Sequence, residues 1–206
     1  MDLQHPTPEL LIRAYTRGIF PMVDSRTREI VWLSPDPRAI LPLGGLRVSH
    51  SLARTLRRGT FEIRSDTAFE RVMRECAAAR AGRESTWIDE RLVQAYTGLH
   101  ALGLAHSVEA WREGELVGGL YGVHVGAVFC GESMFSRPEL GGTDASKVCL
   151  VRLVEWLGQG GFQLLDVQFQ SAHLARLGCV EIPRDAYLEC LGRALRRWGT
   201  WPARTQ

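Results

Sequence analysis

A change of hydrophobic period near residue 103 restricts the fold of this chain more than any other feature. Residues 89–103 place apolar side chains at helical spacing and end at Gly103, a typical helix stop. Three short apolar runs then follow, at residues 105–112, 116–124 and 127–130. They predict an antiparallel meander. A helix over residues 145–157 and a strand over 164–169 come next, and this order is typical of α+β and mixed α/β domains.

The first 84 residues contain shorter elements, separated by proline and glycine. Their periodic segments predict helices and short strands, at residues 8–18, 30–33, 39–41, 51–58, 60–64 and 66–79. We therefore expect an α+β protein with a small N-terminal α/β domain over residues 1–84 and a mixed-sheet domain over residues 85–206. Helices over residues 172–177 and 189–198 are expected near the end, the last one burying Trp198.

Composition limits the class of protein. With 206 residues, 45% of them hydrophobic, the chain can bury a sizeable core. No apolar run approaches the roughly 20 residues of a membrane span, and the first residues do not have the pattern of a signal peptide. We expect a cytoplasmic monomer with no membrane partner. The five cysteines form no Cys-x-x-Cys pair, so neither a disulfide framework nor a metal site is indicated, and no cofactor is expected.

Positive charge is concentrated between residues 50 and 83, where eight arginines accompany four acidic residues. Such an excess can follow phosphates, and Arg54, Arg57 and Arg58 are the first candidates for that contact. A solvated helix face explains the same charges, and composition alone favours it because no base-reading motif is present. Lys147 is the single lysine. It marks either a place where a compact point charge is needed or the effect of codon bias.

Polar side chains follow two of the predicted strands. Residues 129–137 place Glu132 just after the third strand of the meander. An unpaired carboxylate is costly to bury, so this mixture of residues indicates a site rather than a core. Asp166 and Gln168 end a later strand and, two residues apart, are expected to share one face. If the two strands are neighbours, both side chains can point into the space that Glu132 borders. A simple strand cap is the alternative for this pair.

These segments resemble the leucyl/phenylalanyl-tRNA–protein transferase family. The resemblance extends from about Leu10 to Tyr187 and rests on separated motifs in the same order. They are Ser-Pro-Asp-Pro-Arg at residues 34–38, Thr-Trp-Ile at 86–88, His-Ser-Val-Glu at 106–109, and the segments 129–137 and 164–168. The chain is identified from them as a member of this family. The resemblance implies an acetyltransferase-like (GNAT-like) fold for the mixed-sheet domain.

The resemblance also implies a reaction and its partners. A family member moves Leu, Phe or Met from a charged tRNA to the α-amine of a protein that begins with Arg or Lys, which marks that protein for N-end-rule degradation. The amine attacks an aminoacyl ester. The site must therefore orient a neutral amine, stabilise the tetrahedral oxyanion and return a proton to the ribose oxygen that leaves.

Matching positions carry the family's site residues over to this chain. The implied catalytic residues are Glu132, Asp166 and Gln168. The implied donor side-chain pocket is formed by Leu120, Phe129 and Met134. The implied contacts to the tRNA are Trp87 and Met22 at the terminal adenosine and Arg54, Arg57, Arg58 and Lys147 at the phosphates. By this hypothesis Asp166 orients Gln168 and pairs with the cationic acceptor, while Gln168 and Glu132 position the amine and the ester.

The chain departs from the family at three places. Met22 stands where Trp is usual, Leu120 stands where well-known members have Met, and the loop at residues 138–144 is longer than usual and contains a double glycine. One methylene distinguishes substrates by only about 1 to 3 kcal/mol, so loose selectivity among large apolar donors is expected.

Two other functions fit part of the pattern. An acyl-coenzyme A N-acyltransferase shares the implied fold, but it needs a [Gln or Arg]-x-x-Gly-x-[Gly or Ala] phosphate loop at a helix start. Residues 159–161, Gln-Gly-Gly, are better interpreted as a helix stop. A non-catalytic RNA-binding module would use the arginines, but it would not explain Glu132 and Asp166, because carboxylates repel phosphates.

Overall fold

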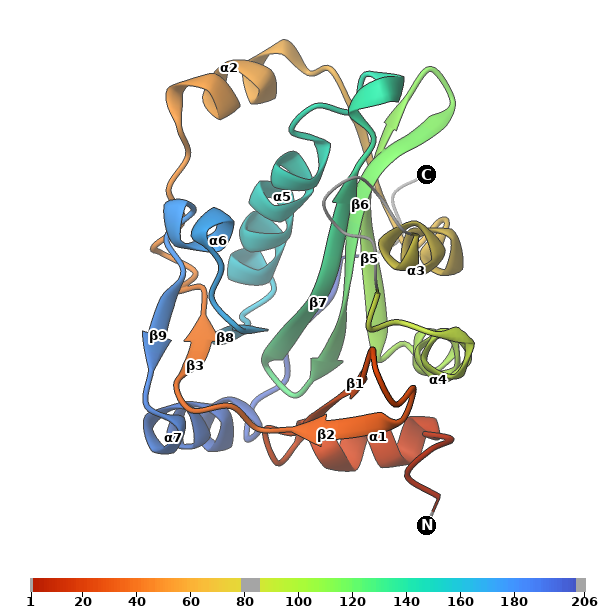
Figure 1. Ribbon diagram of the computed structural model, residues 1–206. Helices are drawn as coiled ribbons and strands as arrows, with labels where there is room; N and C mark the ends of the chain where they lie inside the picture. The colour runs from red at the N-terminus through yellow and green to blue at the C-terminus, as the bar shows by residue number, and fades with distance from the viewer. Residues whose placement is uncertain (1, 79–85, 203–206) are drawn as a thin grey trace.

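The computed structural model describes residues 2–78 and 86–202. Its strands are β1 (Phe20–Val23), β2 (Ile30–Leu33), β3 (Arg38–Ile40), β4 (Glu62–Ser65), β5 (Ala105–Arg112), β6 (Glu115–Val125), β7 (Val128–Ser136), β8 (Leu164–Gln168) and β9 (Val180–Ile182). Seven of them form one mixed sheet in the order β4-β5-β6-β7-β8-β3-β9, and β1 and β2 form a separate antiparallel pair (Figure 1). The expected mixed-sheet class is therefore confirmed.

Helices cover both faces of the main sheet. They are α1 (Pro8–Tyr15), α2 (His50–Arg58), α3 (Phe69–Ala77), α4 (Glu90–Ala101), α5 (Ala145–Gln159), α6 (Ala172–Arg176) and α7 (Arg184–Ala194), with a 3-10 turn at Pro138–Leu140. Helices α3 and α4 pack on one face and α5 on the other, so the sheet is the middle of three layers (Figure 1). Within residues 2–78 and 86–202, no helix has the length and apolar character needed to cross a membrane.

Local signals in the sequence account for where several helices begin. Thr7 caps α1 with its side chain, and Pro8 occupies the first turn, where no backbone donor is needed. Asp89 caps α4 by accepting from the backbone of Arg91 and Leu92. Helix α5 stops at Gln159, which confirms that the following glycines end a helix rather than begin one.

The hydrophobic core is divided by the sheet into two clusters. One cluster joins α1, α3 and α4 to the sheet and includes Tyr15, Tyr96 and Tyr121. The other lies under α5 and includes Phe129 and Leu153. Four of the five cysteines are buried and Cys190 is partly buried, all of them as free thiols, which agrees with their expected role as small apolar side chains.

The predicted meander is confirmed, since β5, β6 and β7 pair antiparallel in sequence order. Its third strand is longer than predicted and runs to Ser136, so Glu132 lies inside a strand rather than after one. The predicted helix at residues 189–198 was also placed too late. Helix α7 ends at Ala194, and Trp198 is 66% exposed instead of buried.

The main sheet crosses the expected domain boundary after residue 84. Strands β3 and β4 precede that boundary, yet β3 pairs with β8 and β9 and β4 pairs with β5. Residues 38–40 and 62–65 thus share one sheet with residues 105–182. Strands from before and after residue 84 therefore belong to one sheet. Local periodicity could not predict this, because it carries no information about which strands become neighbours.

Candidate active site

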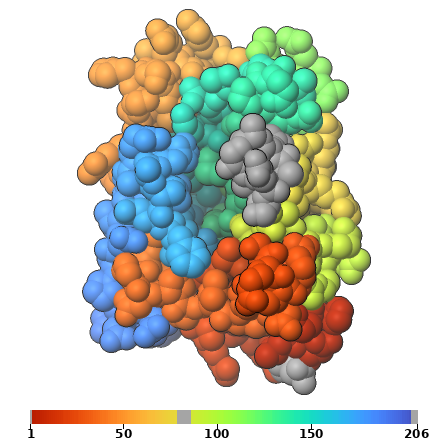
Figure 2. All heavy atoms as spheres, in the orientation of Figure 1, coloured from red at the N-terminus to blue at the C-terminus, as the bar shows by residue number. Residues whose placement is uncertain are grey.

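Strands β7 and β8 separate partway along their length and leave an opening. They pair in parallel only from Val128 with Leu164 to Cys130 with Asp166. Beyond that point β7 continues along β6, while β8 ends beside β3. Figure 2 shows this face of the molecule hollowed at its centre, next to the blue atoms of α6. The backbone that follows Cys130 and Asp166 therefore lines a cleft, as the neighbouring-strand hypothesis requires.

A β-bulge turns Glu132 into this cleft. Gly131 pairs with Gly122 and Ser133 pairs with Tyr121, so the register shifts and Glu132 is the extra residue of β7. A bulge bends its strand and changes the direction of a side chain. The glycine opposite is necessary here, because a Cβ on Gly122 would lie 2.3 Å from the Cys130 carbonyl oxygen.

A second irregularity turns Gln168 toward Glu132. Opposite β3, the register shifts between Asp166 and Gln168, which pair with Ile40 and Ala39 respectively. Gln168 also adopts a positive φ of 57°, which is uncommon for a residue with a side chain. The expected approach of Gln168 to Glu132 is found, since Gln168 Nε2 lies 3.0 Å from Glu132 Oε1.

Neutral donors surround the Glu132 carboxyl. Gln168 Nε2 donates to its Oε1 at 3.0 Å, and the Tyr96 hydroxyl donates to its Oε2 at 3.4 Å. Tyr96 is in turn hydrogen-bonded to the hydroxyl of Tyr15. Burial raises the pKa of Glu132 to about 8, and the nearby charge of Asp166 adds to this, while hydrogen bonds from Tyr15 and Tyr96 oppose it. A carboxyl with this pKa gains and loses a proton near neutral pH.

Asp166 has a very different environment. Arg38 donates to both of its oxygens, from Nε at 2.9 Å and from Nη2 at 2.6 Å, and both side chains are fully buried. The Tyr187 hydroxyl and the Gln168 backbone N–H complete its shell, at 2.9 and 3.0 Å. The carboxylate is saturated by the protein, so the hypothesised pairing of Asp166 with an acceptor's cation does not fit this geometry. Its contact with the Gln168 backbone does fit an orienting role.

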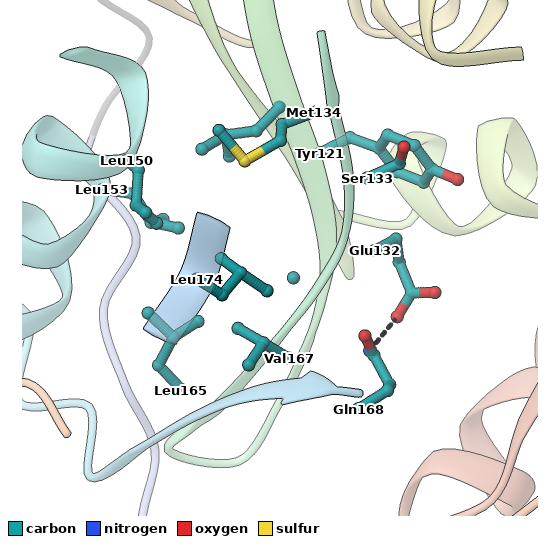
Figure 3. A pocket seen from close by; sticks show the side chains of 12 residues that line it. Tyr121, Glu132, Ser133, Met134, Leu150, Leu153, Leu165, Val167, Gln168 and Leu174 are labelled. Carbon is teal, nitrogen blue, oxygen red and sulfur yellow. Dashed lines mark hydrogen bonds between the residues drawn. The ribbon is translucent and has the colours of Figure 1, made fainter. Parts of the chain in front are cut away.

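An apolar cavity of about 100 Å³ extends from Glu132 and Gln168 under α5. Figure 3 shows Glu132 and Gln168 joined by a hydrogen bond at one end, Tyr121 and Ser133 nearby, and Met134 with leucine and valine side chains around the rest. The apolar lining residues are Leu120, Met134, Leu150, Leu153, Leu165, Val167 and Leu174. One water needs only about 10 to 15 Å³ in comparable terms, so a branched or aromatic side chain has room to enter with small adjustments of Met134.

A second cavity of about 210 Å³ shares Glu132 and Gln168 with the first. Aromatic and sulfur side chains form its outer wall: Phe20, Met22, Trp87 and Phe169. Phe169 is 47% exposed and meets Phe20 edge to face, with ring centroids 5.7 Å apart. Glu132 therefore lies where an aliphatic cavity joins a cavity lined by rings.

Comparison with known proteins decides the family. A model described as "Leucyl/phenylalanyl-tRNA protein transferase" matches residues 40–192, and the model of that family's N-terminal domain matches residues 5–36. This chain belongs to the leucyl/phenylalanyl-tRNA protein transferase family. The expectation drawn from separated motifs is confirmed.

Curated members of the family are similar over nearly the whole chain. The transferase of Novosphingobium aromaticivorans is 55% identical over 94% of this chain and 72% of its own length. Those of Paramagnetospirillum magneticum and Rubrobacter xylanophilus are 54% and 56% identical, each over 92% of this chain, and the match covers 89% and 95% of their lengths.

Solved structures that match this transferase-family chain are more distant. L-PGS from Bacillus licheniformis has a TM-score of 0.45 and 13% identity, over 76% of this chain and 51% of that one. A GCN5-related N-acetyltransferase-like protein from Streptococcus suis has a TM-score of 0.38 and 14% identity, over 84% of this chain and 63% of that one.

The structure brings together most of the site residues implied by the resemblance to the transferase family. Leu120 and Met134 line the apolar cavity, and Trp87 and Met22 line the cavity beside it. Phe129 lines neither cavity: it is fully buried in the same core cluster as the leucines of the aliphatic cavity, and its ring stacks on that of Trp201, with centroids 5.2 Å apart. Its place in the strand suits the core under α5.

The basic candidates lie on two helices that contact each other. Arg54, Arg57 and Arg58 are all exposed on α2, and Lys147 lies in the first turn of α5, paired with Asp144. Other arginines of the basic window carry acidic partners: Arg74 binds Glu70 and Glu90, as a solvated face would. The last residues of that window, 79–83, lie outside the described residues.

Sequence reasoning missed several residues of the transferase-family site. Arg38 is notable in the sequence only as part of the Ser-Pro-Asp-Pro-Arg motif, and Tyr15 and Tyr96 match ordinary core positions of helices. Phe169 is the exception, because an aromatic residue directly after Gln168 is unusual for a strand end and offered a signal. Nothing in the spacing of the other three links them to residues 132 or 166.

Proposed function

We propose that this protein transfers Leu, Phe or Met from an aminoacyl-tRNA to the N-terminal α-amine of proteins that begin with Arg or Lys. One observation carries the proposal: the Glu132 carboxyl, hydrogen-bonded to Gln168, lies where the aliphatic cavity meets the ring-lined cavity. An aminoacyl-adenosine has three parts in the same order as the aliphatic cavity, Glu132 and the ring-lined cavity. Its apolar side chain, its ester and its base are consecutive parts of one molecule.

The aliphatic cavity is the proposed place for the donor side chain. Leu, Phe and Met share size and hydrophobicity but have no polar group in common, and the cavity offers them methyl groups and one thioether. Met134 adapts its shape to several guests. Leu120, buried beside it, contributes a fixed wall. Discrimination among these donors is accordingly expected to be small.

The ring-lined cavity is the proposed place for the terminal adenosine. Stacking of a base on an aromatic ring contributes about 1 to 3 kcal/mol, and Trp87 supplies the largest ring of this wall. Met22 adds a polarizable contact. The exposed arginines of α2, with Lys147, are proposed to follow the phosphates farther along the tRNA.

The reaction requires one proton to move. The acceptor amine attacks the ester carbon, the C–N bond forms, and the bond to the ribose oxygen breaks. With a pKa of about 7.7 to 8.0, much of the α-amine is already neutral and can attack. The nitrogen becomes cationic as the C–N bond forms, and Glu132, with a pKa of about 8, is placed to take that proton and pass it to the departing ribose oxygen. The Gln168 amide orients these groups. Below pH 8 Glu132 increasingly holds its own proton, so the rate should fall as pH falls.

Asp166 is proposed to act through Gln168 rather than on a substrate. Its Oδ1 accepts the Gln168 backbone N–H, which stabilises the turn that aims the amide at Glu132. The protein is proposed to be a cytoplasmic monomer. It is proposed to need no cofactor, because charged tRNA and a protein N-terminus are the only reactants. Its products would enter N-end-rule degradation.

A transfer assay tests this function. Labelled Leu, Phe and Met on charged tRNA are offered with peptides that begin with Arg, Lys, Asp, Glu or Ala. We expect transfer to the Arg and Lys peptides only, and a loss of about 10²- to 10⁴-fold for Glu132→Gln. Glu155→Gln, which removes an exposed carboxylate on α5, is the matched control and should keep full activity.

Each alternative outcome contradicts a different part of the proposal. Transfer only to Asp or Glu peptides would overturn the acceptor rule. Tight binding of charged tRNA without any transfer would support a binding module. Acylation of the same peptides by an acyl-coenzyme A in the absence of tRNA would support the N-acyltransferase alternative.

A further inference from the structure

We propose that Tyr15 and Tyr96 form a positioning pair that acts through Glu132, holding its carboxyl toward the cleft and favouring its ionised form. The proposal rests on the proposed function, in which Glu132 accepts a proton. The two tyrosines come from α1 and α4, 81 residues apart in the chain. Neither touches the aliphatic cavity or the ring-lined cavity.

The geometry forms a short chain of hydroxyl groups. Tyr15 and Tyr96 are 1% and 0% exposed, and their rings meet edge to face with centroids 6.4 Å apart. Their hydroxyls are hydrogen-bonded to each other, and the Tyr96 hydroxyl donates to Glu132 Oε2. Gln168 holds the other carboxyl oxygen. Each carboxyl oxygen of Glu132 thus accepts from a neutral donor.

Packing alone does not require these hydroxyls. Both rings lie in a large apolar cluster, where phenylalanine would fill nearly the same volume. Replacing both partners of a buried hydrogen bond by apolar groups of the same shape costs little stability, so a phenol pair in such a place contributes little by packing. What the hydroxyls add is a connection to Glu132. Loss of one phenol hydroxyl leaves the carboxyl with fewer donors.

The charges around Glu132 make neutral donors important. The titratable groups that face it are Tyr15 from α1, Tyr96 from α4, Cys130 from its own strand, Asp166 from β8 and Arg38 from β3. The two full charges among them bind each other. Burial raises the pKa of Glu132, and the hydrogen bonds from the two phenols lower it again. These two hydrogen bonds therefore keep the pKa of Glu132 low enough for part of the carboxyl to be ionised near neutral pH.

The test compares the pH dependence of kcat in Tyr15→Phe, Tyr96→Phe and the wild type, using saturating Leu-tRNA and an Arg peptide. We expect kcat at pH 7.5 to fall about 3- to 10-fold in each variant and its acid limb to move up by about half to one pH unit. The KM for Leu-tRNA should stay within twofold. In a Glu132→Gln background the same Tyr→Phe changes should have no further effect.

A second readout does not depend on activity. The carboxyl ¹³C resonance of Glu132 should titrate about half to one pH unit higher in each variant than in the wild type. An unchanged midpoint, or an equal loss of kcat with and without Glu132, would overturn the proposal and leave the tyrosines as packing residues. If the wild type transfers nothing, the proposed function fails, and the ¹³C midpoints still decide whether the pair acts on Glu132.

Discussion

Two carboxylates on neighbouring strands of this protein have opposite surroundings. Asp166, at the end of β8, is enclosed by the Arg38 guanidinium, the Tyr187 hydroxyl and a backbone N–H, and no part of it is exposed. Glu132, on β7, borders a cleft, and within residues 2–78 and 86–202 only neutral donors bind its oxygens. The strands are adjacent at Cys130 and Asp166 and separate directly afterwards.

One sheet thus places a buried ion pair beside a carboxyl whose pKa lies near neutral pH. A guanidinium that binds both carboxylate oxygens neutralises a buried charge and anchors β8 to β3. Neutral donors orient a carboxyl without fixing its charge, and burial then brings its pKa close to that of an α-amine. The first arrangement is suited to architecture, and the second is suited to acid–base chemistry.

The largest effect is expected from Arg38→Met. This change leaves the buried Asp166 carboxylate without its cation, which should lower the free energy of unfolding by about 3 to 5 kcal/mol in urea titrations. The matched control is Arg152→Met, which removes an exposed ion pair with Glu155 and should cost at most about 1 kcal/mol. Equal losses for the two variants would show that the buried Arg38–Asp166 pair stabilises the fold no more than an exposed ion pair does.

A smaller effect is expected from Trp87→Ala, in the cleft beside Glu132. Loss of base stacking should raise the KM for charged tRNA about 5- to 100-fold, with kcat nearly unchanged, because the ring lines the cleft beside Glu132. Steady-state kinetics with Leu-tRNA provides the measurement. Trp198→Ala is the control, since that ring is 66% exposed on another part of the chain and should leave the KM unchanged. A fall in kcat at constant KM would contradict the stacking role.

Hydrophobic periodicity predicted the strands and the helix that surround this site, but not the register shifts that orient its side chains. The meander and the position of α5 followed from apolar spacing, and Glu132, Asp166 and Gln168 stood out because they follow or end predicted apolar strands. The register shifts on β7 and β8 could not be predicted, because each depends on which residue of a neighbouring strand comes opposite. These shifts accompany the contact of Gln168 with Glu132, while Asp166 binds Arg38.

Side-chain contacts between residues far apart in the chain also could not be predicted from the sequence. Arg38 and Asp166 are 128 residues apart, and nothing in either segment identifies the other. Phe129 was implied as a pocket residue by resemblance, yet the strand places its ring in the core with Trp201. Trp198 was expected to be buried, but it is exposed, and the partly buried Trp201 stacks on His106 and Phe129 instead.

The most direct measurement is the titration of Glu132 in the free protein, followed by its carboxyl ¹³C resonance and assigned by comparison with Glu132→Gln. The contrast between the two carboxylates predicts a midpoint near pH 8, because burial and neutral donors surround this group. A midpoint near the ordinary glutamate value of 4.5 would contradict it. Glu132 would then be ionised throughout the physiological range and could not exchange a proton with the acceptor amine as proposed.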